Sequence, residues 1–280
     1  MPVTRRHLFE LYWALERRIV PGVESSQNQY ARIVEAHVTS TTRWLDLGCG
    51  HQLWPDWIPV RKTATAAALL VGVDPDLESV RQNTVVHHRV VGLQLPFRDG
   101  SFDLVTSNMV FEHLEDPVAV LREIRRVLIP SGVCIFHTVN SRYWLTALAR
   151  HLPQRLKNFL VRLSEGRNAK DVYPTHDRIN TERDIHASLR QARFTPDEVM
   201  MLNTSSAGRI LLIGPLVVVE LLWIRLTQRP ALSRYRSNII AIIRPSADAM
   251  PATIGDRTAA ATSSPCQRRT DNAPCGPGLA

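Results

Sequence analysis

The sequence has few cysteines, and their spacing argues against two classes of small protein. Four occur in 280 residues, Cys49, Cys134, Cys266 and Cys275, with no CxxC pair and no zinc-finger spacing. Disulfide scaffolds and zinc modules need cysteines in recurring, closely spaced patterns. No cluster of His, Asp or Glu has metal-ligand spacing either. We therefore expect a protein of the reducing cytoplasm that folds around a hydrophobic core and binds no metal.

Long apolar runs are also missing. The longest, Ile210 to Ile224, is shorter than the ~20 residues that a membrane span needs, and it contains Gly214, Pro215 and Glu220. A buried or interfacial helix is the better prediction for this run.

The first residues lack the apolar core of a signal peptide. Residues 5–19 begin with arginines, but Glu10, Glu16, Arg17 and Arg18 interrupt any hydrophobic segment. Their apolar residues fall on one stripe at helical spacing. This pattern predicts an amphipathic helix that packs on the domain, with docking on a membrane surface as the less favoured alternative.

Charge is unevenly distributed, and its pattern bears on partners. The net charge is +8, and residues 142–170 hold seven Lys or Arg against one Glu. This excess suits an anionic substrate or an acidic membrane surface, although a solvated helical face is the simpler reading. Nucleic acid is an unlikely partner, because aromatic residues are sparse there and no helix-turn-helix, RRM or zinc pattern occurs.

Two glycines follow an apolar segment in Trp44-Leu45-Asp46-Leu47-Gly48-Cys49-Gly50, and a second apolar segment, residues 69–74, ends in Asp74. A strand, a glycine turn and a second strand that ends in a carboxylate hold the ribose of a nucleotide-like cofactor in α/β sheets. A dinucleotide fingerprint needs a third glycine, but Leu53 stands there. The pattern therefore favours S-adenosylmethionine, which has a ribose and no phosphate.

Strand and helix patterns alternate from residue 42 to residue 138, which predicts a Rossmann-like α/β fold, a mostly parallel sheet with helices on both faces. Later residues supply a helix over 181–193, begun by the capping box Thr181-x-x-Asp184, and two more strands. The expected strands are 42–47, 69–74, 89–92, 102–107, 133–138, 199–202 and 237–244, and helices are expected over 76–83 and 117–128, the latter ended by Pro130-Ser131-Gly132.

The composition suggests three regions along the chain. Residues 1–40 are predicted to be a helical extension and residues 41–245 the main domain, with a helical insertion at about 142–230. Residues 246–280 contain no aromatic residue, and many are Pro, Ala, Ser or Thr. Such a segment buries too little apolar surface to order itself, so we expect a disordered tail.

Four ordered stretches resemble the class I S-adenosylmethionine-dependent methyltransferases of the type 11 group. They are WLDLGCG at 44–50, VGVDPD at 71–76, LPFRDGSFDLVTSNMVFEHLEDP at 95–117 and LREIRRVLIPSG at 121–132. Together they cover about a third of the chain. The resemblance implies a seven-stranded sheet whose last strand, near 237–244, is antiparallel.

The resemblance also implies roles for individual residues. Asp46 would orient the methionine amino group, Asp74 would bind the ribose hydroxyls, and Pro75 would lie against the adenine. Backbone approach to the cofactor would come from Gly48, Cys49 and Gly50, and the floor beneath the sulfonium from Asn108 and Met109. A carboxylate that the family often places before LPF is absent here, so Leu93 or Gln94 would contact the adenine.

Methyl transfer needs a base only when the acceptor must lose a proton. The candidates are His113, which follows the fourth strand, and His176, in a loop that could fold over the site; His137 ranks below them. For each, a structural histidine is the more common outcome. Glu115 and Asp116 are expected to begin the helix at Pro117 rather than to form a catalytic pair.

These observations predict an S-adenosylmethionine-dependent methyltransferase that acts on a small-molecule, lipid or glycan acceptor. The apolar run and the basic stretch add the hypothesis of peripheral contact with the inner surface of the membrane. Two alternatives stay open: a nucleotide-dependent oxidoreductase on a similar sheet, and a non-catalytic subunit that binds the cofactor and supports a partner enzyme.

Overall fold

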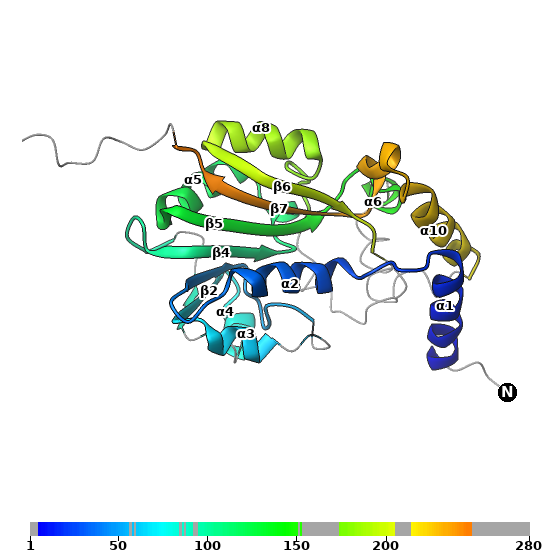
Figure 1. Ribbon diagram of the computed structural model, residues 1–280, viewed down its shortest axis with the longest axis horizontal. Helices are drawn as coiled ribbons and strands as arrows, with labels where there is room; N and C mark the ends of the chain where they lie inside the picture. Colours follow the sequence, from blue (N-terminus) through cyan, green and yellow to red (C-terminus); the bar gives the residue numbers. More distant parts are fainter. Residues whose placement is uncertain are drawn as a thin grey trace, which may run out of the picture.

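A single twisted sheet forms the centre of the computed structural model, which describes residues 5–55, 58, 60–83, 86, 88–91, 95–150, 152, 174–204 and 214–247 (Figure 1). Its strand order is β3-β2-β1-β4-β5-β7-β6. The strands are β1 (Arg43–Leu47), β2 (Leu69–Asp74), β3 (His88–Val91), β4 (Phe102–Asn108), β5 (Leu128–Val139), β6 (Phe194–Leu202) and β7 (Asn238–Pro245). Strands β3, β2, β1, β4 and β5 pair in parallel, and β7 is antiparallel to both β5 and β6. The predicted sheet with its antiparallel last strand is confirmed.

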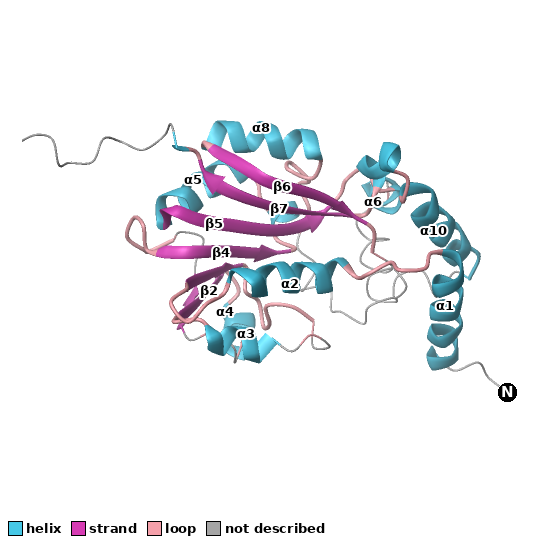
Figure 2. Cartoon of the chain, viewed as in Figure 1, coloured by secondary structure: helices cyan, strands magenta, loops and turns pink. Residues whose placement is uncertain are grey.

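Some helices cover the two faces of this sheet, and others, among them α1 and α10, lie beside it. The described helices are α1 (Arg5–Ile19), α2 (Ser26–His37), α3 (Val60–Ala66), α4 (Leu77–Gln82), η1 (Phe111–His113), α5 (Pro117–Val127), α6 (Trp144–Arg150), α8 (Glu182–Ala192), α10 (Gly214–Thr227) and η3 (Pro230–Tyr235). Figure 2 shows α5 and α8 on the side opposite α2, α3 and α4. Among the described residues, no helix is both long and apolar enough to cross a bilayer.

Successive residues of a strand point to opposite faces of the sheet, and they pack in two separate hydrophobic cores, one on each face. In β1, Trp44 packs in the cluster under α2 and α3, and Leu45 in the cluster under α5 and α8. In β5, Ile135 packs in the cluster under α2 and α3, and Phe136 in the cluster under α5 and α8. This alternation follows from the period of two along a strand, and it means that both faces are buried.

Two predicted boundaries are wrong, and both involve proline. The segment Pro130-Ser131-Gly132 lies inside β5, where the pairing with β4 jumps from Phe102↔Leu128 to Leu104↔Val133. Strand β6 begins at Phe194 rather than 199, although it contains Pro196. Proline is tolerated because β6 is an edge strand with a register shift after Pro196, and the β5 segment is a bulge.

Other expectations are met at the helix ends. Asp116 caps α5 by accepting from the Ala119 amide, and Thr181 caps α8 by accepting from the Asp184 amide.

Within the expected insertion at 142–230, α8 and β6 are part of the sheet and its covering layer. Residues 248–280, predicted to be disordered, and most of the basic stretch 142–170 lie outside the described residues.

A third, smaller core joins α1 to α10, two helices that are far apart in the sequence. Tyr12 of α1 packs with Leu221 and Ile224 of α10, and the Arg225 guanidinium donates to the Ile19 carbonyl at 2.8 Å. Glu220, which interrupts the apolar run, is buried and accepts hydrogen bonds from Tyr143 and Trp144. Pairing of its carboxylate with two donors explains how α10 tolerates a buried acid.

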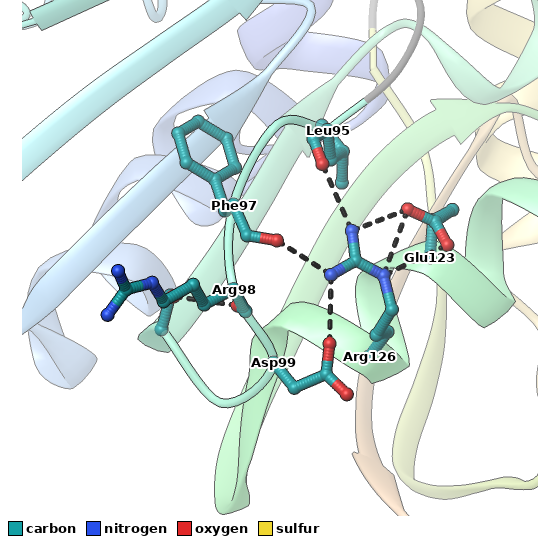
Figure 3. Close-up of polar contacts among 7 residues, drawn as sticks. Leu95, Phe97, Arg98, Asp99, Glu123 and Arg126 are labelled. Carbon is teal, nitrogen blue, oxygen red and sulfur yellow. Dashed lines mark hydrogen bonds and ion pairs between the residues drawn. The ribbon is translucent and has the colours of Figure 1, made fainter. Parts of the chain in front are cut away.

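Arg126 fixes the loop that precedes β4 (Figure 3). Its guanidinium donates to the carbonyls of Phe97 (2.7 Å) and Leu95 (3.0 Å) and to the carboxylates of Asp99 (3.0 Å) and Glu123 (2.7 Å). The hydrogen bond from Arg126 lowers the pKa of Glu123. The LPFRDG stretch is thus tied to α5 by one side chain.

We expect Arg126→Ala to lower the free energy of unfolding by about 1–3 kcal/mol, because backbone carbonyls lose charged donors. Urea denaturation measures this change. Arg122→Ala, an exposed site on the same helix, is the matched control and is expected to stay within about 0.5 kcal/mol of the wild type. Equal effects of the two substitutions would mean that the Arg126 contacts contribute nothing specific.

Candidate functional site

The glycine turn after β1 is held against the end of β2. The amides of Gly48 and Cys49 both donate to the Val73 carbonyl, at 2.7 and 3.1 Å. Gly48 has a φ of +73°, and a Cβ there would come within 2.2 Å of a Val110 methyl group, so the position requires glycine. Gly50, at φ +46°, has no atom within 4 Å of the place of a Cβ. The turn therefore exposes open space at Gly50, where a ligand can approach the backbone.

The Cys49 side chain points away from that space. Its thiol is buried in the core under α2 and α3, and a Cβ on Gly72 would lie 2.7 Å from its sulfur. Only the backbone of Cys49 is thus available to a ligand at the turn.

Asp74 ends β2 and faces the same turn. One carboxylate oxygen accepts from the Gly50 amide and the other from the Asp76 amide, both at 2.9 Å. The helix that follows is capped by Asp76, not by Asp74, because Asp76 accepts from the Glu78 amide. A carboxylate oxygen has two lone pairs, so each oxygen of Asp74 can accept a further hydrogen bond. Pro75 beside it is exposed.

Asp46 is buried near the end of β1. Its carboxylate accepts from the Thr106 hydroxyl at 2.5 Å, and that hydroxyl accepts from the Trp44 indole at 2.6 Å. Burial raises the pKa of Asp46 to about 7; the Thr106 hydrogen bond acts in the opposite direction, and the negative charge of Asp74 adds to the rise. The site therefore contains a carboxylate that burial penalises and that a cation would stabilise.

Asn108 at the end of β4 joins three segments. Its amide nitrogen donates to the Gln27 side chain (2.9 Å) and the Leu53 carbonyl (3.0 Å), and its oxygen lies 2.9 Å from Nδ1 of His137. His137 Nε2 lies 3.2 Å from the Asn238 amide nitrogen. The ring must therefore donate through Nδ1 and accept through Nε2.

That arrangement makes His137 a structural residue. It is fully buried, it stacks on Tyr30, and burial lowers its pKa to about 3. A neutral ring with both nitrogens engaged cannot serve as a base, which agrees with its lower rank in the sequence analysis.

Met109 follows Asn108 in a left-handed conformation, with a φ of +59°. Its amide donates to the His137 carbonyl at 2.8 Å, which holds this conformation in place. Non-glycine residues in this region cost energy and are concentrated at functional sites. The strain lies at the carboxyl end of β4, next to the β1 turn through the contact of Gly48 with Val110.

His113 and His176 meet on the segment after β4. His113 Nδ1 donates to the Pro174 carbonyl at 2.8 Å, and the backbone amides of His176 and Asp177 both donate to the Glu112 carbonyl. His176 also lies 3.7 Å from Glu115. Residues 174–177 are thus hydrogen-bonded to η1, the segment that follows β4, and the expected cover over the site stays a prediction.

A buried carboxylate anchors this loop. Glu112 accepts from the Thr138 hydroxyl at 2.8 Å, and Asn180 donates to the same hydroxyl and to the Val139 carbonyl. Burial raises the pKa of Glu112. The chain Glu112–Thr138–Asn180 connects η1, β5 and the loop before α8.

The structure therefore gathers Asp46, the 48–50 turn, Asp74 and Asn108 at the carboxyl edge of β1, β2 and β4. The predicted contact residue Leu93 lies outside the described residues. Sequence reasoning missed Thr106, Gln27, Tyr30 and Asn180. Only Thr106 had a usable signal, since it pairs with Asp46 across two parallel strands and so shares its face.

Among the described residues, no three His, Cys, Asp or Glu side chains are grouped as metal ligands.

Comparison with known proteins places the same segment in one family. Residues 45–136 match the model of a methyltransferase domain. The chain is 35% identical over 98 residues to malonyl-[acyl-carrier protein] O-methyltransferase of Serratia marcescens, which is 34% of this chain and 37% of the relative. It is 31% identical over 109 residues to demethylmenaquinone methyltransferase of Staphylococcus saprophyticus, which is 36% of this chain and 46% of that relative. The chain thus spans less than half the length of these curated relatives.

A solved structure shares the fold. The S-adenosylmethionine-dependent methyltransferase of Mesorhizobium loti aligns with a TM-score of 0.50 at 20% identity, over 77% of this chain and 96% of that chain. The family match falls on β1 to β5, the strands that carry the glycine turn, Asp46, Asp74 and Asn108. Residues 45–136 therefore match the methyltransferase domain of the type 11 group, the family that the sequence stretches resemble.

Proposed function

We propose that this protein transfers a methyl group from S-adenosylmethionine to a small-molecule, lipid or glycan acceptor. The observation that carries the proposal is the Asp74 carboxylate, whose two oxygens are oriented by the amides of Gly50 and Asp76 beside open space at Gly50. A fixed carboxylate next to an approachable backbone suits a ribose with two neighbouring hydroxyls. When bound, the cofactor supplies a methyl group on a sulfonium, whose leaving group is neutral.

Asp46 is suited to bind the amino group in the methionine part of S-adenosylmethionine. Its buried carboxylate has a pKa of about 7 and no cationic partner among the described residues. An ammonium group at this position would compensate the buried charge and lower that pKa. Asp46 and Asp74 end neighbouring strands, so they would hold the two ends of one ligand, with the 48–50 turn between them.

The acceptor side is proposed to lie near His113 and His176. Donation to the Pro174 carbonyl puts a proton on Nδ1 of His113, so the basic lone pair of the neutral ring is on Nε2. His113 and His176 are the candidate bases for an acceptor, whereas the buried ring of His137 has both nitrogens engaged and is not. The relatives from Serratia and Staphylococcus are named for malonyl-[acyl-carrier protein] and demethylmenaquinone, which supports an acceptor other than nucleic acid.

Replacing Asp74 tests the ribose assignment. We expect Asp74→Ala to weaken binding of S-adenosylhomocysteine by about 1–3 kcal/mol, because ligand hydroxyls lose their acceptor. Isothermal titration calorimetry measures this change. The matched control is Asp76→Ala, which removes the α4 cap and should lower stability while leaving affinity nearly unchanged. Unchanged affinity in Asp74→Ala would refute the assignment, and tight binding of NAD would favour the oxidoreductase alternative.

The pKa of Asp46 predicts a pH dependence of cofactor binding. The ligand ammonium pairs with ionised Asp46, and below pH ~7 the free protein must first lose a proton. Affinity for S-adenosylhomocysteine should therefore fall about tenfold for each pH unit below 7 and level off above it. Asp46→Asn should bind more weakly at pH 8 and show no such slope. A wild-type affinity that is constant between pH 5.5 and 8 would contradict the pairing.

Asp46 also makes the stability of the ligand-free protein depend on pH, in the direction opposite to that of a salt-bridged carboxylate. Because the folded protein holds the Asp46 proton more tightly than the unfolded chain does, this residue makes the ligand-free protein less stable as the pH rises from about 4 to 7. Thermal unfolding of the wild type and of Asp46→Asn over this range separates this contribution from those of other groups.

Turnover itself needs a labelling experiment. Incubation of the protein with methyl-labelled S-adenosylmethionine and a fractionated cell extract should transfer label to a small-molecule, lipid or glycan fraction. Asp74→Ala should reduce the transfer at subsaturating cofactor. Cofactor binding without transfer to any fraction would instead indicate the non-catalytic subunit, and label in nucleic acid would overturn the acceptor class.

A further inference from the structure

Helix α10 is apolar on two faces, and the described part of the chain covers only one of them. Its buried face contributes Val217, Leu221 and Ile224 to the core shared with α1. A second face holds Val218, Val219, Leu222 and Leu226, which are between 43% and 54% exposed. A helix that is apolar all round is normally enclosed by protein or lipid. Among the described residues, the second face of α10 therefore lacks the cover that its composition calls for.

Helix α1 adds exposed apolar side chains to the same helix pair. Leu11 and Trp13 are 58% and 47% exposed on opposite sides of the stripe that packs on α10, so only one of them can share the exposed side of α10. Single exposed apolar residues are ordinary, but the four on one side of α10 mark an interaction surface. We call these four residues of α10, with the adjoining side of α1, the α1–α10 face.

The charge around this face is mostly positive. Among the described exposed side chains of α1, α10 and residues 228–236, one is acidic, Glu10, and five are arginines: Arg17, Arg18, Arg225, Arg229 and Arg234. An apolar helix face bordered by cations is the composition of helices that lie in the interface of an anionic bilayer. A second copy of the same surface would bring like charges together, which opposes self-association.

The position of the face relates it to the site. Figure 2 shows β4 and β5 pointing toward the side of the molecule where α1 and α10 pack, and the candidate site lies at those carboxyl ends. A flat partner that covers the helix pair would thus approach the same side of the molecule as the candidate site.

We propose that the α1–α10 face docks the protein on the surface of a bilayer that contains anionic lipids. The apolar side chains enter the boundary between headgroups and acyl chains, and the arginines contact lipid phosphates. The helices lie on the membrane, because no described helix can span it. This inference stands apart from the proposed function, since docking is measured without cofactor or acceptor.

The test is sedimentation of the full chain with vesicles of phosphatidylcholine alone or with 30% phosphatidylglycerol. We expect binding to the anionic vesicles that weakens at high salt, with each arginine at the surface contributing about fivefold. The double variant Leu222→Gln, Leu226→Gln should bind at least tenfold more weakly. The control is Leu77→Gln, a leucine 46% exposed on α4, which should bind as the wild type does.

A second pair of variants separates charge from hydrophobic contact. Arg17→Gln with Arg18→Gln should reduce binding to anionic vesicles, and Arg81→Gln on α4 should not. Circular dichroism checks that each variant is folded, and S-adenosylhomocysteine affinity should be the same in all of them.

Three results would overturn the proposal. The first is absence of vesicle binding by the wild type at low salt. The second is an equal loss of binding in Leu77→Gln. The third is a dimer in sedimentation velocity that Leu222→Gln, Leu226→Gln abolishes while vesicles bind neither protein, which would assign the face to a second copy.

Discussion

The two hydrogen bonds from the Gly48 and Cys49 amides to the Val73 carbonyl are the constraint on which the site depends. Leu47 and Val73 are already paired in register, so these bonds turn the chain immediately after β1. The turn is possible because Gly48 adopts a positive φ under Val110. It brings the Gly50 amide to Asp74 and fixes the distance between the acids of two strands. A side chain at Gly48 would displace all of these groups together.

The four stretches that resemble the methyltransferase family have two different roles in the structure. WLDLGCG and VGVDPD build the candidate cofactor site directly, through the turn and Asp74. LPFRDG and LREIRRVL instead hold one another, because Arg126 binds the carbonyls of Leu95 and Phe97. A stretch that resembles the family can therefore hold the fold together rather than build the site. Only the contacts in the structure distinguish these two kinds of stretch.

The sheet could be predicted from sequence because strand periodicity, the glycine turn and helix caps are local patterns. Pro130 misled the prediction, since a bulge is not visible in a local window, and the predicted strand 199–202 fell short of β6, whose edge position is not visible there either. The candidate acids were also predictable, because they end apolar strands. Their environment was not: Thr106 is 60 residues from Asp46, and Asn180 is 42 residues from Thr138. Buried polar partners come from distant segments, so the pKa shifts of Asp46 and Glu112 and the physical reason for the lower rank of His137 needed coordinates.

The contacts of α2 have a consequence for the order of folding. Ser26 donates to Thr204, Gln27 accepts from Asn108, and Tyr30 stacks on His137, which Asn238 also binds. The helix precedes all of these partners in the sequence, and they are spread from residue 108 to residue 238. Closing such long loops is slow, so α2 is expected to dock late. Until β7 has paired with β5, His137 lacks one of its two partners, and this side of the sheet stays open during synthesis.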